Sequence, residues 1–129
     1  MKYLSVYLIL LIVFSSCKKK YVVEISPEYE GEWHSAPVVS PTTGVGYEEY
    51  FIIVDGQGVA GGCNSTLVDT NCFQHFNGDA LFNWNKSKFC IGKTFEGAGS
   101  IIFHIDKPPH INSDGIWECT LTGRVYIKR

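Results

Sequence analysis

The sequence lacks most of the patterns that would assign it a chemistry. It contains no C-x-x-C pair, so its cysteine spacing does not favour zinc. It contains no G-x-S-x-G, phosphate-binding loop, calcium loop or H-E-x-x-H motif. We therefore expect no enzyme activity, no metal and no cofactor.

Basic residues are also too few for a nucleic-acid-binding protein. The chain has 11 Lys and Arg against 13 Asp and Glu. Three of the lysines, Lys18, Lys19 and Lys20, lie together near the N-terminus, so the rest of the chain is weakly acidic. A nucleic-acid-binding domain presents a basic face instead. The charge distribution therefore argues against nucleic acid as a partner.

Long hydrophobic runs are missing as well. The longest runs from Tyr3 to Phe14, whereas a membrane-spanning helix needs about 20 apolar residues. Lys2 precedes the run, and the small residues Ser15 and Ser16 follow it, which is typical of a secretory signal. Two alternatives stay open: an ordinary signal peptide beside an incidental Cys17, or an uncleaved anchor oriented by the three lysines.

The end of this leader resembles the lipobox of bacterial lipoproteins. Phe14-Ser15-Ser16-Cys17 has a large apolar residue and two small ones before the cysteine. The resemblance implies cleavage after residue 16, a diacylglyceryl group on Cys17 and attachment to a membrane. The Ser-Ser-Cys-Lys-Lys-Lys junction is similar to leaders common among Bacteroidota. We therefore expect a lipid-anchored protein of the cell envelope, at the outer membrane.

The other four cysteines are Cys63, Cys72, Cys90 and Cys119. An even number in an exported chain favours disulfides, although the sequence leaves their pairing open. Cys63 and Cys72 flank a polar stretch that is typical of a loop between strands, so we expect this pair to be linked. The remaining pair would then be Cys90–Cys119, even though alternation places Cys90 opposite Phe89 and Ile91.

The pattern of the remaining chain predicts an all-β domain over residues 28–129, preceded by a lipidated tether over 17–27. Residues 28–34 alternate strictly, and residues 50–54 are β-branched and aromatic. Asp55-Gly56 and Thr122-Gly123 predict turns, and Asn77-Gly78 is the strongest hairpin signal. About eight short strands with regular turn signals indicate a small antiparallel barrel or sandwich.

The first of these strands resembles the start of lipocalin-like domains. Its Gly31-Glu32-Trp33 matches the G-x-W motif of that family. The resemblance implies that Trp33 closes one barrel end and that an arginine near the last strand, Arg124 or Arg129, packs across it. The alternative is that Trp33 is a core aromatic residue of another sandwich or barrel.

Two functions without catalysis follow from this fold. An eight-stranded barrel can hold one small apolar ligand, provided that the many aromatic residues do not simply fill it. A tethered β domain can also serve as an envelope protein-interaction module, either an inhibitor or an accessory subunit. Tyr47 and the Thr66-Leu67-Val68 segment are candidate contacts for such a partner, while His34 is expected to be a solvated histidine.

Overall fold

Several strands coincide with stretches of the chain that are rich in β-branched and aromatic residues. The computed structural model describes residues 22–66 and 68–129. In chain order its elements are β1 (Val22–Glu24), the 3-10 helix η1 (Pro27–Tyr29), β2 (Gly31–Ser35), β3 (Val38–Val39), β4 (Gly46–Val54), β5 (Gln57–Ser65), β6 (Thr70–Asn83), β7 (Lys88–Gly92), β8 (Ser100–Ile111), β9 (Trp117–Leu121) and β10 (Arg124–Lys128).

Eight strands form a closed antiparallel barrel in which each strand pairs with the next one along the barrel. The order runs β2-β4-β5-β6-β7-β8-β9-β10, and β10 pairs with β2 to close the ring. The other two strands are not part of this ring: β1 pairs with β6, and β3 pairs with β4. The sequence predicts an all-β barrel or sandwich of about eight strands. Because the ring is complete, the all-β prediction is confirmed and the fold is the barrel.

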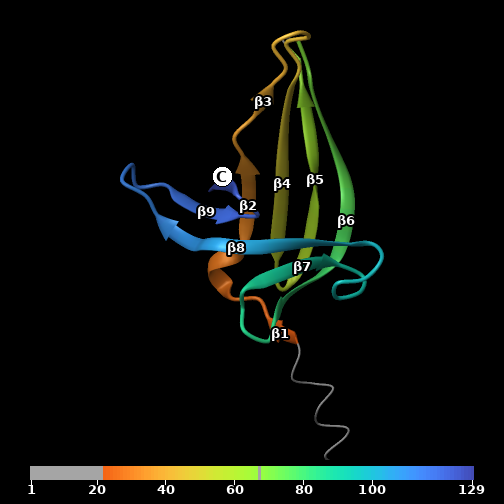
Figure 1. Cartoon of the computed structure of the whole chain (residues 1–129), viewed down its shortest axis with the longest axis vertical. Helices are drawn as coiled ribbons and strands as arrows, with labels where there is room; N and C mark the ends of the chain where they lie inside the picture. Colours follow the sequence, from red (N-terminus) through yellow and green to blue (C-terminus); the bar gives the residue numbers. More distant parts are fainter. Residues whose placement is uncertain (1–21, 67) are drawn as a thin grey trace, which may run out of the picture.

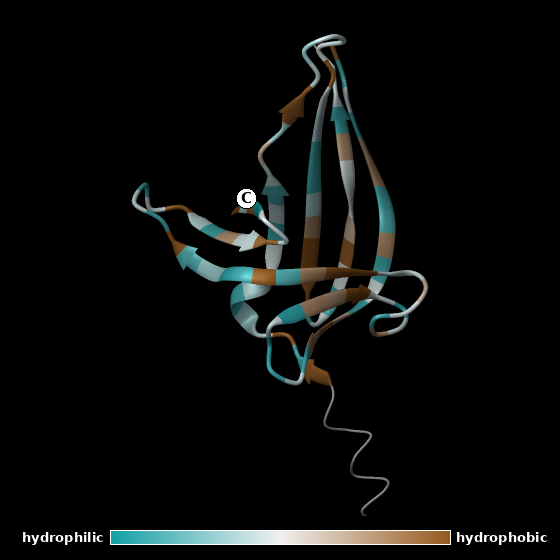
Figure 2. Cartoon of the chain, viewed as in Figure 1, coloured by the Kyte–Doolittle hydropathy of each residue, from teal (hydrophilic) through white to brown (hydrophobic). Residues whose placement is uncertain are grey.

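The two ends of the barrel differ. In Figure 1, β4, β5 and β6 stand side by side and rise above the rest, while β7 and β8 run across them. We call the end where β4 begins and β5 finishes the open end. We call the opposite end, where η1 and the β4–β5 turn at Asp55-Gly56 lie, the closed end. Figure 2 shows that β4 is hydrophobic near the closed end and hydrophilic near the open end.

Aromatic rings fill the closed half of the barrel. Alternation along β2 and β4 directs Trp33 and Phe51 inward, and both are fully buried. The ring of Phe51 stacks on Trp33 with centroids 5.9 Å apart and contacts Phe103 at 5.2 Å. Tyr29 of η1 packs edge-on against Phe89 at 5.3 Å and so covers this end. Burying each such side chain stabilises the fold by about 1.5–3 kcal/mol.

Two of the expected turns are confirmed and one expected hairpin is wrong. Asp55-Gly56 and Thr122-Gly123 have positive φ at both residues and join β4 to β5 and β9 to β10. Asn77-Gly78 instead lies inside β6, paired with Val59 and Gly58. Gly78 has φ 146°, and a Cβ there would lie 2.2 Å from the carbonyl oxygen of Gly92. This glycine permits the close approach where β6 passes from β5 to β7, so the strand continues instead of reversing.

One predicted disulfide is confirmed. Cys63 and Cys72 lie opposite each other on β5 and β6 and are covalently linked.

The second predicted disulfide, Cys90–Cys119, is wrong: both cysteines are free and buried. Cys119 belongs to the core inside the barrel. Cys90 lies between the inward-facing Phe89 and Ile91, so it faces outward beside Leu81 and Ile102 of the neighbouring strands. The two thiols are therefore on opposite sides of the barrel wall.

The folded part begins earlier than residue 28. Val22–Glu24 pairs with Leu81–Asn83, and Ile25 is only 7% exposed within the core. The leader and Cys17 lie outside the described residues. Over residues 22–66 and 68–129, no helix combines the length and hydrophobicity that a membrane-crossing segment needs.

Candidate binding site

Two adjoining hollows lie at the open end of the barrel, and Glu49, Ile101, Phe103 and Tyr126 line both of them. The first has a volume of about 180 Å³ and the second about 230 Å³. The first is lined mainly by Tyr47, Glu49, His75, Phe76, Phe103 and Tyr126. The second adds Leu121, Thr122 and Arg124.

Strand alternation explains why charged residues face this interior. On β4, Glu49 shares the inward face with the buried Phe51 and Ile53. On β10, Arg124 shares the inward face with the buried Tyr126. β4 is fixed at this point by the backbone N–H of Glu49, which donates to Oγ of Ser35 at 2.9 Å. The two charged side chains therefore meet inside the barrel wall.

Glu49, Arg124 and Tyr126 form a polar cluster, which we call the mouth triad. The Tyr126 hydroxyl donates to Oε2 of Glu49 at 2.9 Å. Nη1 of Arg124 is 3.6 Å from Oε1 of Glu49. This Nη1 is buried and finds no hydrogen-bond acceptor among the residues that the structure describes. Burial, together with the hydrogen bond to Glu49, raises the pKa of Tyr126 well above its ordinary value, so the hydroxyl remains a donor at neutral pH.

Glycines make room for the aromatic wall of the first hollow. The chain register shifts between Ala60 and Gly61, as a bulge does, and a Cβ on Gly62 would lie 2.6 Å from the hydroxyl of Tyr47. A bulge and a close approach of the chain therefore both occur at Gly61-Gly62. On the neighbouring strand, the exposed His75 packs edge-on against Phe73, with ring centroids 4.8 Å apart. The wall of the first hollow is thus aromatic on both sides of β5.

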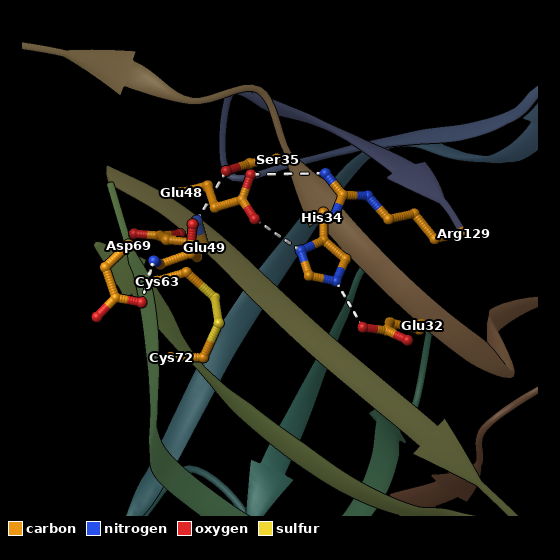
Figure 3. Close-up of a disulfide and its surroundings, with 10 residues drawn as sticks. Glu32, His34, Ser35, Glu48, Glu49, Cys63, Asp69, Cys72 and Arg129 are labelled. Atoms are coloured by element: carbon orange, nitrogen blue, oxygen red, sulfur yellow. Dashed lines mark hydrogen bonds and ion pairs between the residues drawn. A yellow bond between two sulfur atoms is a disulfide. The ribbon is translucent and has the colours of Figure 1, made fainter. Parts of the chain in front are cut away.

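A second polar cluster lies on the outer wall of the barrel and is shown in Figure 3. His34 places Nε2 2.7 Å from Oε1 of Glu32 and Nδ1 3.0 Å from Oε1 of Glu48. Arg129 adds a cation 3.7 Å from Glu48. His34 is only 7% exposed, so the expectation of a solvated histidine is wrong. The cluster links β2, β4 and the residue after β10. It lies on the outer face of the barrel wall, whereas the mouth triad lies on the inner face.

The motif residues of the lipocalin resemblance are brought together only in part. Trp33 is buried at the barrel end, and its Nε1–H donates to the carbonyl oxygen of Tyr29 at 3.0 Å. The cation over its ring is Lys128, with Nζ 5.6 Å from the centroid, and Gly31 faces the stem of that lysine. Arg124 and Arg129 pair with Glu49 and Glu48 instead, because β10 directs them to other positions.

The residues expected to contact a protein partner lie on β4 and in the loop between β5 and β6. Tyr47 is half-buried in the wall of the first hollow. Thr66 accepts hydrogen bonds from the backbone N–H groups of Val68 and Asp69 in the loop between β5 and β6, and Val68 is 96% exposed. Leu67 lies outside the described residues. A cluster of three or more His, Cys, Asp or Glu side chains that would suit a metal ion does not occur within residues 22–66 and 68–129.

Sequence reasoning missed Glu49, the carboxylate that lines both hollows. A signal for it exists: in Tyr47-Glu48-Glu49-Tyr50-Phe51, alternation places a carboxylate on the face of Phe51, where an apolar residue is expected. Protein-family models, curated proteins and solved structures yield no match to this chain. Function is therefore inferred from the geometry of the open end.

Proposed function

We propose that this protein is a lipid-anchored binding protein that holds a small ligand at the open end of its barrel without catalysing a reaction on it. The observation that carries the proposal is the mouth triad, set among aromatic side chains beside the two hollows. Apolar walls with a few convergent polar groups are typical of ligand sites. A buried guanidinium nitrogen that has no acceptor among the described residues also leaves hydrogen-bonding capacity for a bound molecule.

The filled closed half limits the size of that ligand. Drug-sized ligands occupy pockets of about 300–1,000 Å³, and each hollow is smaller than this. Trp33, Phe51 and Phe89 occupy the space that a long apolar ligand would need deeper in the barrel. A small molecule that binds among the open-end side chains therefore fits better than the purely apolar ligand expected from the sequence.

The position of β1 gives the anchor an orientation. β1 begins with Val22 at the closed end (Figure 1) and lies five positions after Cys17 (22 − 17). An extended chain of that length spans at most about 18 Å. A lipid on Cys17 would hold the closed end towards the membrane and direct the open end away from it. The ligand would then enter from the aqueous side.

One observation favours the second candidate function, a protein-interaction module of the envelope. Ile111 and Trp117 pair across β8 and β9 and are 58% and 39% exposed, and Ile116 beside them is 41% exposed. Exposed apolar groups that lie together are common at protein contacts. Affinity purification from envelope extract tests this function, with the lipidated protein and its Trp117→Ser variant as baits. If the unaltered protein enriches no protein more strongly than the variant does, this function is contradicted.

Native mass spectrometry tests the binding function directly. The chain from Lys18 onward retains every described strand and is recovered from the native envelope without its lipid. We expect a small adduct that survives gentle ionisation and is lost on denaturation. A native mass equal to that of the chain with one disulfide, in samples from several growth conditions, would contradict the proposal.

A further inference from the structure

The two hollows differ in the charge that lines them. In the first, Glu49 is the charged group, and the rings of Tyr47, Phe76 and Phe103 surround it. In the second, Arg124 stands beside Thr122 and the apolar Leu121. Glu49 lies where the hollows meet, so a molecule that occupies both passes a carboxylate and a guanidinium in turn.

The pairing of Arg124 with Glu49 leaves both groups with capacity to bind. Charge-assisted hydrogen bonds between such groups are about 2.7–2.9 Å long, whereas Nη1 and Oε1 are 3.6 Å apart. Nη1 is buried and lacks an acceptor within the described part of the chain. A ligand oxygen at Arg124 would satisfy this donor, and an anionic oxygen would do so most strongly.

The aromatic hollow favours the opposite charge. Oε2 of Glu49 accepts from Tyr126, and Oε1 forms no hydrogen bond with the described residues other than its long contact to Arg124. A cation near the faces of tyrosine and phenylalanine rings is further attracted by their quadrupoles. An ammonium group placed here would therefore meet both a carboxylate and several aromatic rings.

We propose that the ligand is a small zwitterion of the α-amino-acid type, whose ammonium group binds Glu49 in the aromatic hollow and whose carboxylate binds Arg124. This inference rests on the proposed binding function and names its ligand class. The separation of 3.6 Å between Oε1 and Nη1 suits a molecule whose opposite charges are joined through one carbon atom. Its side chain would be apolar, because Ile101, Phe103 and Leu121 also line the second hollow.

The test compares matched probes that differ by one charge. Isothermal titration of the chain from Lys18 onward uses L-leucine and L-phenylalanine, their N-acetyl derivatives without the ammonium, and their amides without the carboxylate. We expect at least one free amino acid to bind and each of its derivatives to bind at least about tenfold more weakly, as the loss of one charged hydrogen bond implies. Equal binding of the three forms would overturn the inference.

Variants assign each charge to its residue. Glu49→Gln should reduce the affinity for the free amino acid at least about tenfold and leave the weak binding of the N-acetyl derivative unchanged. Arg124→Gln should likewise reduce the affinity for the free amino acid at least about tenfold and leave the weak binding of the amide unchanged. Glu24→Gln, which removes an exposed carboxylate at the closed end, is the matched control and should bind as the unaltered protein does. Circular dichroism and the melting temperature establish that each variant is folded.

The native mass experiment separates the failure of this inference from failure of the proposed function. A native adduct that lacks either an ammonium or a carboxylate group overturns the zwitterion and leaves the binding function standing. If no adduct is present and none of the six probes binds, both are overturned.

Discussion

Lys128 lies across the ring of Trp33, with its Nζ 5.6 Å from the ring centroid. The same ammonium is 5.8 Å from the ring of Trp117. Because Lys128 is on β10 and Trp33 on β2, this contact joins the two strands that close the barrel. The aliphatic stem of the lysine also passes Gly31, where a Cβ would lie 2.7 Å from Cε.

The first prediction separates the charge of this lysine from its stem. Lys128→Met keeps an apolar chain beside the rings and removes the ammonium, so the free energy of unfolding should fall by about 0.5–2 kcal/mol. Lys128→Ala should lower the free energy of unfolding further, because the packing of the aliphatic stem is lost as well. Urea unfolding followed by tryptophan fluorescence measures both, with the exposed Lys93→Met as the control. A Lys128→Met variant as stable as Lys93→Met would contradict a cation–π contribution.

The second prediction concerns the outer-wall cluster. His34→Ala should lower the free energy of unfolding by about 1–3 kcal/mol, because Glu48, only 16% exposed, loses its nearest partner. His104→Ala is the matched control: that side chain is exposed, so its loss should change stability by no more than about 0.5 kcal/mol. Thermal or urea unfolding measures the difference. Equal stability of the two variants would mean that the cluster contributes nothing.

The extent to which sequence predicts this fold depends on how local each signal is. The turn at Asp55-Gly56 depends on neighbouring residues alone and is found as expected. The alternating stretch 28–34 forms a strand only from Gly31 onward, because Pro27–Tyr29 is the 3-10 helix η1, and His34 on its predicted polar face is buried. Asn77-Gly78 carries an equally local turn signal, yet its conformation is set by the crossing of β6 from β5 to β7. Tertiary pairing therefore overrides turn chemistry at that position.

The candidate site was less predictable because its partners come from distant strands. The burial of His34 requires Glu48, which β4 supplies, and the mouth triad requires Glu49 and Tyr126, which lie 77 positions apart. Alternation within one strand predicts which face of the sheet a residue occupies. It correctly placed Cys90 on the face opposite to Phe89 and Ile91. It does not state which strand lies opposite, so neither cluster follows from the sequence alone.

The third prediction concerns the number of reactive thiols in the chain from Lys18 onward, which lacks Cys17. The folded protein should show almost no reaction with a thiol reagent, because Cys90 and Cys119 are both buried. Denaturation without a reductant should expose these two thiols and no others. Mass mapping of the alkylated peptides then identifies them. A Cys90–Cys119 link in that map would contradict the arrangement of the barrel wall.

Reduction of Cys63–Cys72 should lower the free energy of unfolding. The two cysteines are 9 positions apart, and closing a short loop of this kind contributes about 2–3 kcal/mol. The double variant Cys63→Ser/Cys72→Ser should lose a similar amount without a reductant, and adding dithiothreitol should not destabilise it further. If the unaltered protein keeps its urea midpoint in dithiothreitol, the disulfide does not stabilise the fold.

The last prediction is a loss of stability at alkaline pH. Burial raises the pKa of the Cys119 thiol from its ordinary value of 9.0 to about 12, and burial also raises the pKa of Cys90, Tyr29 and Tyr126. Above about pH 9 the unfolded chain releases the proton of Cys119 while the folded chain retains it. Folding then binds protons, so the free energy of unfolding decreases as pH rises, by up to about 1.4 kcal/mol per pH unit for one group.

Cys119→Ala isolates this contribution. The substitution lowers stability at every pH because it removes a buried sulfur, but the readout is the slope of the free energy of unfolding between about pH 8 and pH 10. We expect a shallower decline in Cys119→Ala than in the unaltered protein, since one group with a raised pKa is absent and the tyrosines ionise at higher pH. The exposed Thr122→Ser keeps every buried thiol and should retain the original slope. Identical slopes in all three proteins would show that Cys119 ionises as freely in the barrel as in the unfolded chain.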